Sequence, residues 1–301
     1  MPLPHPLLAL APLVSLAVPQ IHGASGAQQA GDVEIVAART DRYERMTVPV
    51  RIAEQPFHFL IDTGAQNTVL SIATAAQLAL VPGGRARLIG VAGSQMVDTV
   101  EIDQIDLGRR SYYGIVAPLL EGRDIGADGI VGLDSLQDQR VLLDFRNKLM
   151  AIGDAKTLGG NSGYEIVVTA RRRSGQLIMT NAMIDGVATD VVIDTGAESS
   201  IGNRALQRAL SRRRGSEQTT LTSVTGQQIV ADLGLARELK ISSMSLRNVL
   251  IAYADAPPFE SLGLAKKPAI FLGMRDLRSF NRVAIDFNTR RVMFDLPREA
   301  F

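Results

Sequence analysis

The tetrapeptide Asp-Thr-Gly-Ala occurs twice in this chain of 301 residues, each time at the end of an apolar run typical of a buried β-strand. The first copy closes the segment 57–65 and the second closes the segment 190–197. A carboxylate at the end of a buried strand is costly to keep in apolar surroundings, and the Gly beside it permits a tight turn. Two such strand ends in one chain indicate that the two carboxylates meet. This restricts the fold to two related halves that face one another.

The duplication extends beyond the tetrapeptide, because three further landmarks recur in the same order. They are a pair of short strands around a Gly, two apolar residues followed by Gly, and the pattern Val-x-x-Asp-Phe of a hairpin strand. The partners are Gly93 and Gly226, Gly132 and Gly273, and Asp144 and Asp286. The spacing between partners stays nearly constant, apart from one insertion in the second half that we place in the loop 256–268. A repeat of this kind predicts a tandem duplication.

With these motifs the chain resembles the aspartic proteases of the pepsin and retropepsin superfamily over roughly residues 47–297. In that family each lobe supplies one catalytic Asp, one flap hairpin and one apolar-apolar-Gly element. The resemblance implies an all-β, two-lobed acid protease fold, with each lobe a closed β-barrel-like unit that carries a flap hairpin and a short helix. The Ala after each Gly, and a flap-like hairpin without Tyr in both halves, favour a bacterial-type, single-chain, retropepsin-like protease.

The resemblance also implies roles for the residues of the repeated motif. Asp62 and Asp194 are expected to form the catalytic dyad, whereas either Asp alone would be more typical of a turn after a strand. Two carboxylates in one site cannot both ionise easily, so one serves as base toward a water and the other as acid. Which of them holds the proton stays open, because the pair titrates as a unit. The expected supporting residues are Thr63, Gly64, Ala65, Thr195, Gly196 and Ala197.

Substrate contacts are expected from the two flaps and from the residue that follows each motif. A flap closes over an extended peptide and donates main-chain hydrogen bonds to it. An ordinary hairpin is the alternative for each flap, and a solvated loop residue is the alternative for the Glu. The expected substrate-binding residues are Gly93, Ser94, Gly226, Gln227, Gln66 and Glu198.

Four segments are expected along the chain. Residues 1–27 resemble a secretory signal peptide, because a short apolar stretch is followed by the small-residue pattern of a cleavage site. This predicts a periplasmic or secreted bacterial protein, although no Lys or Arg precedes the apolar stretch, and an uncleaved anchor is the alternative. Residues 28–154 and 164–301 are the expected lobes, and the Gly-rich segment 155–163 is the expected linker. Two helices are expected, at 72–80 and 204–213.

The composition argues against several other classes of function. The formal net charge is +1, so no overall field favours nucleic acid or an anionic membrane. The Arg triplets 171–173 and 212–214 lack interleaved aromatic residues and are expected to be solvated turns. The chain has no Cys, and its three His form no cluster with metal-ligand spacing, so we expect neither a metal nor a cofactor.

The sequence therefore predicts an aspartic endopeptidase that acts on peptide or protein substrates, with no nucleic-acid partner and no membrane contact after leader removal. Two half-sites in one chain predict a monomer, and pairing of each lobe with a second chain is the alternative. A peptide-binding protein that holds substrates without cutting them is the alternative from a different functional class. Two facing buried carboxylates argue against it, because binding alone does not require them.

Overall fold

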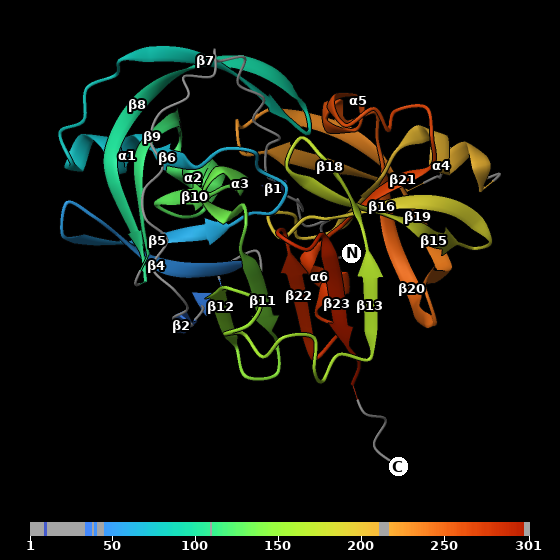
Figure 1. Ribbon diagram of the computed structural model, residues 1–301. Coiled ribbons are helices and arrows are strands. Elements are labelled where there is room, and N and C mark those ends of the chain that lie inside the picture. Colours follow the sequence, from blue (N-terminus) through green and yellow to red (C-terminus); the bar gives the residue numbers. More distant parts are fainter. Residues whose placement is uncertain are drawn as a thin grey trace, which may run out of the picture.

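A computed structural model of the chain describes residues 9–10, 34–37, 39–40, 45–108, 110–210 and 217–297. These residues form three β-sheets, and the helices between them are short. One sheet belongs mainly to each half of the sequence, and the third runs below both (Figure 1). The expected all-β, two-lobed fold is confirmed.

The first lobe contains an eight-stranded sheet in the order β3-β4-β5-β10-β6-β9-β8-β7, with an additional pairing between β4 and β8. Its strands are β3 (Arg39–Thr40), β4 (Met46–Ile52), β5 (Gln55–Ile61), β6 (Val69–Ser71), β7 (Gly84–Gly90), β8 (Gly93–Leu107), β9 (Arg110–Leu120) and β10 (Gly129–Val131). Its helices are α1 (Ile72–Gln77), α2 (Gly122–Ile125) and α3 (Leu133–Leu136).

The second lobe repeats this arrangement in a nine-stranded sheet, ordered β1-β18-β19-β20-β17-β21-β16-β15-β14, with an additional pairing between β15 and β19. Its strands are β1 (Ala9–Leu10), β14 (Arg171–Arg173), β15 (Gln176–Ile184), β16 (Val187–Ile193), β17 (Ser200–Gly202), β18 (Gln218–Ser223), β19 (Gln228–Ile241), β20 (Met244–Tyr253) and β21 (Ala269–Leu272). Its helices are α4 (Arg204–Ala209), α5 (Pro257–Ser261) and α6 (Met274–Leu277). The closed barrel expected for each lobe stays a prediction.

A six-stranded sheet joins the lobes, in the order β13-β23-β22-β11-β12-β2. Its strands are β2 (Glu34–Ala37), β11 (Arg140–Asp144), β12 (Leu149–Gly153), β13 (Ile166–Thr169), β22 (Arg282–Asp286) and β23 (Arg291–Asp295). At its centre β11 and β22 are antiparallel, and Arg140 forms a buried ion pair with Asp286 at 2.8 Å. Arg140 also donates to Asn161 Oδ1 at 3.0 Å, so the expected linker is held against the shared sheet. The expected segment boundaries stay predictions.

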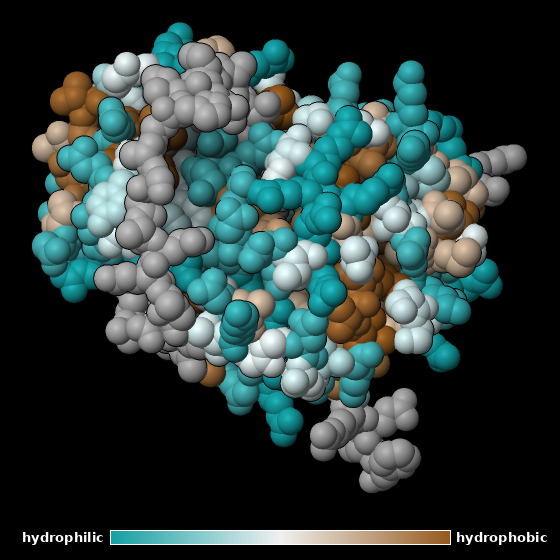
Figure 2. Space-filling model, viewed as in Figure 1, coloured by the Kyte–Doolittle hydropathy of each residue, from teal (hydrophilic) through white to brown (hydrophobic). Residues whose placement is uncertain are grey.

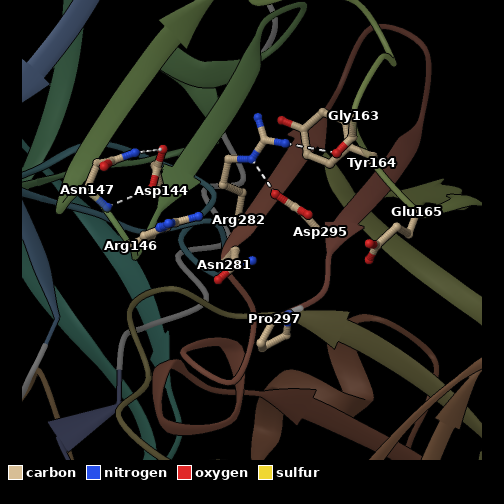
Figure 3. Close-up of a pocket in the computed structure, with 10 residues that line it drawn as sticks. All are labelled: Asp144, Arg146, Asn147, Gly163, Tyr164, Glu165, Asn281, Arg282, Asp295 and Pro297. Carbon is tan, nitrogen blue, oxygen red and sulfur yellow. Dashed lines mark hydrogen bonds and ion pairs between the residues drawn. The ribbon is translucent and has the colours of Figure 1, made fainter. Parts of the chain in front are cut away.

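A polar cavity of about 830 Å³ lies where Asp144 of β11 pairs with Arg282 of β22, at the opposite end of this strand pair from Arg140 (Figure 3). Arg282 crosses it, donating to Asp295 Oδ2 at 2.6 Å and to the Gly163 carbonyl at 2.8 Å. Its guanidinium also lies over the Tyr164 ring, 5.0 Å from the centroid. The cavity contains no residue of either Asp-Thr-Gly-Ala motif, and within it Arg282 of β22 joins the end of the linker to Asp295 of β23.

Helices α1 and α4 follow the two motifs at equivalent positions because each starts at a side-chain cap. The Ser71 hydroxyl accepts from the Thr74 amide at 3.0 Å, and Asn203 Oδ1 accepts from the Leu206 amide at 2.8 Å. The helix expected at 72–80 ends at Gln77, and the helix expected at 204–213 ends at Ala209, with 211–216 outside the described residues. The four other short helices were not expected from the sequence.

Two further expectations concern the Arg triplets and the terminal leader. The triplet 171–173 is wrongly assigned as a turn, since it forms the exposed edge strand β14, paired with β15 through a turn at Ser174 and Gly175. The triplet 212–214 and most of the leader lie outside the described residues. None of the described helices is long and apolar enough to cross a membrane.

The insertion expected in the second half lies between β20 and β21, where α5 and the turn after it make this connection longer than the one that holds α2. Helix α5 packs against β7 of the first lobe. The outer face seen in Figure 2 is largely hydrophilic with separate hydrophobic patches, because most large apolar side chains lie in the core.

Candidate active site

Each Asp-Thr-Gly-Ala motif forms a loop that is enclosed by its own lobe. β5 ends at Ile61, and the Asp62 amide donates to the Val131 carbonyl at 3.1 Å. β16 ends at Ile193, and the Asp194 amide donates to the Leu272 carbonyl at 3.0 Å. The strands β10 and β21 therefore fix where the two Asp residues leave the sheets.

The apolar-apolar-Gly elements serve these same loops. A Cβ on Gly132 would lie 2.4 Å from the backbone of Asn67, and a Cβ on Gly273 would lie 2.6 Å from the backbone of Ser199. No other residue fits this approach without moving the chain, since Cβ contacts under 3.0 Å do not occur. The repeated Gly thus lets the loop after each Asp pack directly against the end of β10 or β21.

The two loops are joined across the lobes by Thr63 and Thr195. The Thr63 amide donates to Thr195 Oγ1 at 3.0 Å, and the Thr195 amide donates to Thr63 Oγ1 at 3.3 Å. Each hydroxyl then donates to the strand of the other lobe, at Ile193 and Ile61, over 2.9 Å and 2.7 Å. These reciprocal bonds fix the distance between the two Asp residues.

The carboxyl groups of Asp62 and Asp194 are buried, with exposed fractions of 0% and 3%. Asp62 Oδ1 accepts from the Gly64 amide at 2.7 Å and from the Ala65 amide at 3.1 Å. Asp194 Oδ1 accepts from Gly196 and Ala197 in the same way, at 3.1 Å each.

The carboxyl of Asp194 also lies directly against the first loop, because a Cβ on Gly64 would be 2.7 Å from Asp194 Oδ1. The structure therefore brings together the two Asp residues and all six expected supporting residues.

Burial raises the pKa of both carboxyl groups, and the two groups influence each other. The pKa of Asp62 lies well above its ordinary value, chiefly because of burial and secondly because of the Asp194 charge. Burial raises the pKa of Asp194 to about 6, with hydrogen bonds from Gly196 and Ala197 opposing the rise. The two carboxyl groups therefore titrate as a pair, and at intermediate pH the pair holds a single proton.

Two hairpins occupy the positions expected for flaps. The first flap consists of β7 and β8, joined by a turn at Val91 and Ala92, with Gly93 at the start of β8 rather than at the tip. The second flap consists of β18 and β19, joined by a turn that contains Gly226 at φ 75°. The short strand β1 lies parallel to β18, at the edge of the second flap.

The tip of each flap is buried in the opposite lobe. Val91 is 1% exposed in a cluster formed by second-lobe residues such as Phe259 of α5. Val224 is 0% exposed in a cluster formed by first-lobe residues such as Ile125 of α2. The tips also lie close to one another, since a Cβ on Gly93 would be 3.0 Å from the side chain of Gln227. Both flaps are therefore closed, and each rests on the short helix of the other lobe.

Three further residues expected to bind substrate are Ser94, Gln66 and Glu198. Ser94 accepts from the Arg87 side chain at 3.0 Å on the first flap. Glu198 pairs with Arg275 of α6 at 3.6 Å, and Gln66 is held through its carbonyl, which accepts from the Asp134 amide at 3.1 Å. Both follow the Asp-Thr-Gly-Ala loops, as the sequence indicates, and their contact with substrate stays a prediction.

Sequence reasoning missed four polar residues behind the loops. Thr68 donates to Asp134 at 2.7 Å and accepts from the Gly132 amide at 3.2 Å. Ser200 and Asp276 repeat this arrangement in the second lobe, where Ser200 accepts from the Gly273 amide at 3.0 Å. Comparison of the two repeats would have aligned Thr68 with Ser200, because both stand six residues after the Asp of their motif.

Sequence reasoning also missed Arg45 and Gln176, which lie beside the two loops and are 0% exposed. Gln176 donates to the Gly64 carbonyl at 2.6 Å, and Arg45 donates to the Gly196 carbonyl over a long 3.5 Å. Within the described part of the chain, no group of three His, Asp or Glu side chains is arranged to hold a metal.

Comparison with known families agrees with this geometry. Residues 48–138 match the family described as "gag-polyprotein putative aspartyl protease", and residues 180–275 match the family described as "Aspartyl protease". Each match contains one Asp-Thr-Gly-Ala motif with its flap and its apolar-apolar-Gly element. A search of curated proteins gives no match. The chain belongs to the retropepsin-like aspartyl proteases, and it carries two such domains in tandem.

Proposed function

We propose that the protein is an aspartic endopeptidase that hydrolyses peptide bonds within extended segments, with Asp62 and Asp194 as the catalytic dyad. The observation that carries this proposal is the burial of two mutually perturbed carboxyl groups on loops joined by Thr63 and Thr195. A pair whose members lose their protons at different pH supplies a base and an acid at the same time.

The reaction follows from these protonation states. The ionised member of the pair takes a proton from a water that attacks the scissile carbonyl carbon. The protonated member donates to the carbonyl oxygen as negative charge develops on it. The tetrahedral intermediate then collapses and the C–N bond breaks. The leaving amine takes the proton that the first carboxyl group received from the water, and a hydroxyl of the intermediate returns a proton to the second carboxyl group. The amides of Gly64 and Gly196 hold the carboxyl groups in place throughout.

The flaps supply the substrate specificity for an extended chain. Their main-chain groups pair with the substrate as an added strand would, and closure removes water from the site. Gly93, Ser94, Gly226 and Gln227 are the proposed flap contacts, with Gln66 and Glu198 at the base of the site.

We further propose export to the bacterial periplasm or outside the cell, with residues 1–27 removed as a signal peptide and the enzyme active as a monomer. Mass spectrometry of the exported protein is expected to find a chain that starts near Gln28. Recovery of the intact Met1 form from the cytoplasm would contradict export and leave the proposed chemistry untouched.

The proposed activity is tested with a random peptide library, incubated with and without pepstatin, followed by mass spectrometry of the products. We expect internal cleavage by the wild type, and its loss in both Asp62→Asn and Asp194→Asn, while circular dichroism shows an unchanged fold. The amide keeps the shape of the side chain and removes the shared proton. Peptide binding without cleavage in the wild type would instead support the binding-protein alternative.

A further inference from the structure

Arg45 and Gln176 occupy equivalent positions in the two repeats. Arg45 immediately precedes β4, and Gln176 is the first residue of β15. Each of these strands pairs with the Asp-bearing strand of its own lobe. Thr47 pairs with Leu60 on β5, and Ile178 pairs with Val192 on β16. Leu60 and Val192 each stand two residues before the Asp, so Arg45 and Gln176, two residues before Thr47 and Ile178, are equivalent. A bulge in β15 between Met179 and Ala182 accounts for the one residue by which the two spacings to the Asp differ.

The two side chains also make equivalent contacts. Gln176 reaches across to the first catalytic loop and donates to the Gly64 carbonyl at 2.6 Å. Arg45 reaches across to the second loop and donates to the Gly196 carbonyl at 3.5 Å, and it donates to the Ile125 carbonyl at the end of α2. Each lobe therefore holds the motif Gly of the other lobe with a buried side-chain donor.

The two side chains differ in charge. Gln176 is neutral, whereas a guanidinium stays protonated throughout the working range of a protein. Arg45 is 0% exposed, so its charge acts at short range through protein rather than through water. Its charge lowers the pKa of Asp62 and the pKa of Asp194, against the larger rise that burial causes in each.

We propose that Arg45 is a positioning residue that both holds the second catalytic loop and favours ionisation of the dyad, while Gln176 only holds the first loop. This inference rests on the proposed function of Asp62 and Asp194. The chain itself supplies the uncharged comparison, because Gln fills the equivalent position in the second lobe.

Other charged groups lie on the elements that pack around the loops. They are Arg123 and Asp124 on α2, Asp134 on α3, Glu198 in the second loop, and Arg275 and Asp276 on α6. Glu198 pairs with Arg275, and Asp276 accepts from Ser200. Among the described residues, Arg45 is the basic group that stands among the main influences on the pKa of both carboxyl groups.

The test is the pH profile of kcat/KM for Arg45→Gln, measured on a peptide that the wild type cleaves. Removal of the positive charge makes both carboxyl groups harder to ionise, so both limbs of the bell are expected to move to higher pH. Arg45→Lys keeps the charge and loses hydrogen bonds, so its rate is expected to fall while both limbs stay in place. A lower rate with unmoved limbs in Arg45→Gln would show that Arg45 only supports the fold.

Gln176→Leu is the matched control, because it removes a loop contact and no charge. Its rate is expected to fall without a shift of either limb, and an equal shift in both variants would overturn the role given to the Arg45 charge. Should Arg45→Gln not fold, Gln176→Arg adds a second cation at the equivalent position and is expected to move both limbs to lower pH. Absence of that move would also overturn the proposal.

A measurement without turnover separates this inference from the proposed function. Titration of Asp carboxyl carbons by NMR, with Asp62→Asn and Asp194→Asn used for assignment, reports the dyad directly. A higher titration range in Arg45→Gln supports the inference even if the protein proves to bind peptides without cleaving them. An unchanged titration in a folded Arg45→Gln variant would refute it even if cleavage is established.

Discussion

Exchange of Val91 for Ala should release the first flap without unfolding the lobe that carries it. Val91 is 1% exposed, and the residues around it belong mainly to the second lobe, including Leu221 and Phe259. The strands of the flap are paired within the first lobe, between β7, β8 and β9. The apolar packing that Val91→Ala removes therefore belongs to the closed state, and the open state does not depend on it.

The size of the effect follows from the buried area. Val→Ala removes the equivalent of two CH₂ groups, and each is worth about 0.8 kcal/mol when buried, or about 1.6 kcal/mol in all. A difference of about 1.4 kcal/mol is tenfold in an equilibrium constant, so the open-to-closed ratio should rise roughly 15-fold. Any further cost of the cavity left behind acts in the same direction.

Amide hydrogen exchange of residues 84–97, followed by mass spectrometry, measures this ratio. Faster exchange is expected at the flap tip in Val91→Ala, with unchanged exchange in the shared sheet. Met96→Ala, on the same flap but 51% exposed, is the control and should exchange like the wild type. Equal acceleration in the flap and in β11 and β22 would refute the reasoning, because it would show that Val91 stabilises the whole fold rather than the closed flap.

Three further variants test the dyad and its supports. Thr63→Val loses the hydrogen bond to the Ile193 carbonyl and leaves the Thr195 amide without its acceptor. The free energy of unfolding measured in urea should therefore fall by about 1–3 kcal/mol, and kcat should fall as well. An unchanged urea midpoint would contradict the role of this network. The pKa of Asp62 is raised in the fold, so the protonated Asp62 side chain contributes fully to stability below about pH 4, and this contribution is lost as the pH rises. The free energy of unfolding of Asp62→Asn, compared with that of the wild type, should therefore increase from pH 4 to pH 7. A decrease over this range would show that the pKa of Asp62 is not raised. The double variant Ala65→Ser with Ala197→Ser places a hydroxyl beside each Asp Oδ1. A hydrogen bond from each hydroxyl favours the ionised carboxylate, so the pH profile of cleavage should move toward acid. An unmoved profile would show that these hydroxyls do not reach the carboxyl groups.

The parts of the site that could be predicted from the sequence are those whose requirements are local. A Gly that must let another backbone pass, such as Gly132, and an Asp at the end of an apolar strand, such as Asp62, are visible in a few residues each. Their repetition then gave the two-lobed architecture. The strand at Arg171–Arg173 was not visible in the same way, because three exposed Arg residues show no apolar alternation, and only the pairing with β15 makes them a strand.

The residues that could not be predicted depend on contacts between the lobes. Arg45 and Gln176 stand at the starts of strands, where a polar side chain is normally solvated, and nothing nearby in the sequence signals that the opposite loop covers them. The burial of Val91 and Val224 has the same origin, since a Val in a hairpin turn would ordinarily be exposed. In each case the deciding partner lies in the other half of the sequence.

The same contacts show what a duplicated single chain offers to this chemistry. In two identical half-sites, identical surroundings cannot assign the proton of the dyad to one particular carboxyl group. Here the surroundings differ, because Arg45 stands opposite Gln176 and the flap tips rest on unlike helices, α2 in one lobe and α5 in the other. The Arg45 charge, which only one half supplies, lowers the pKa of both carboxyl groups. Divergence of the two halves therefore gives the two carboxyl groups unlike surroundings before any substrate binds.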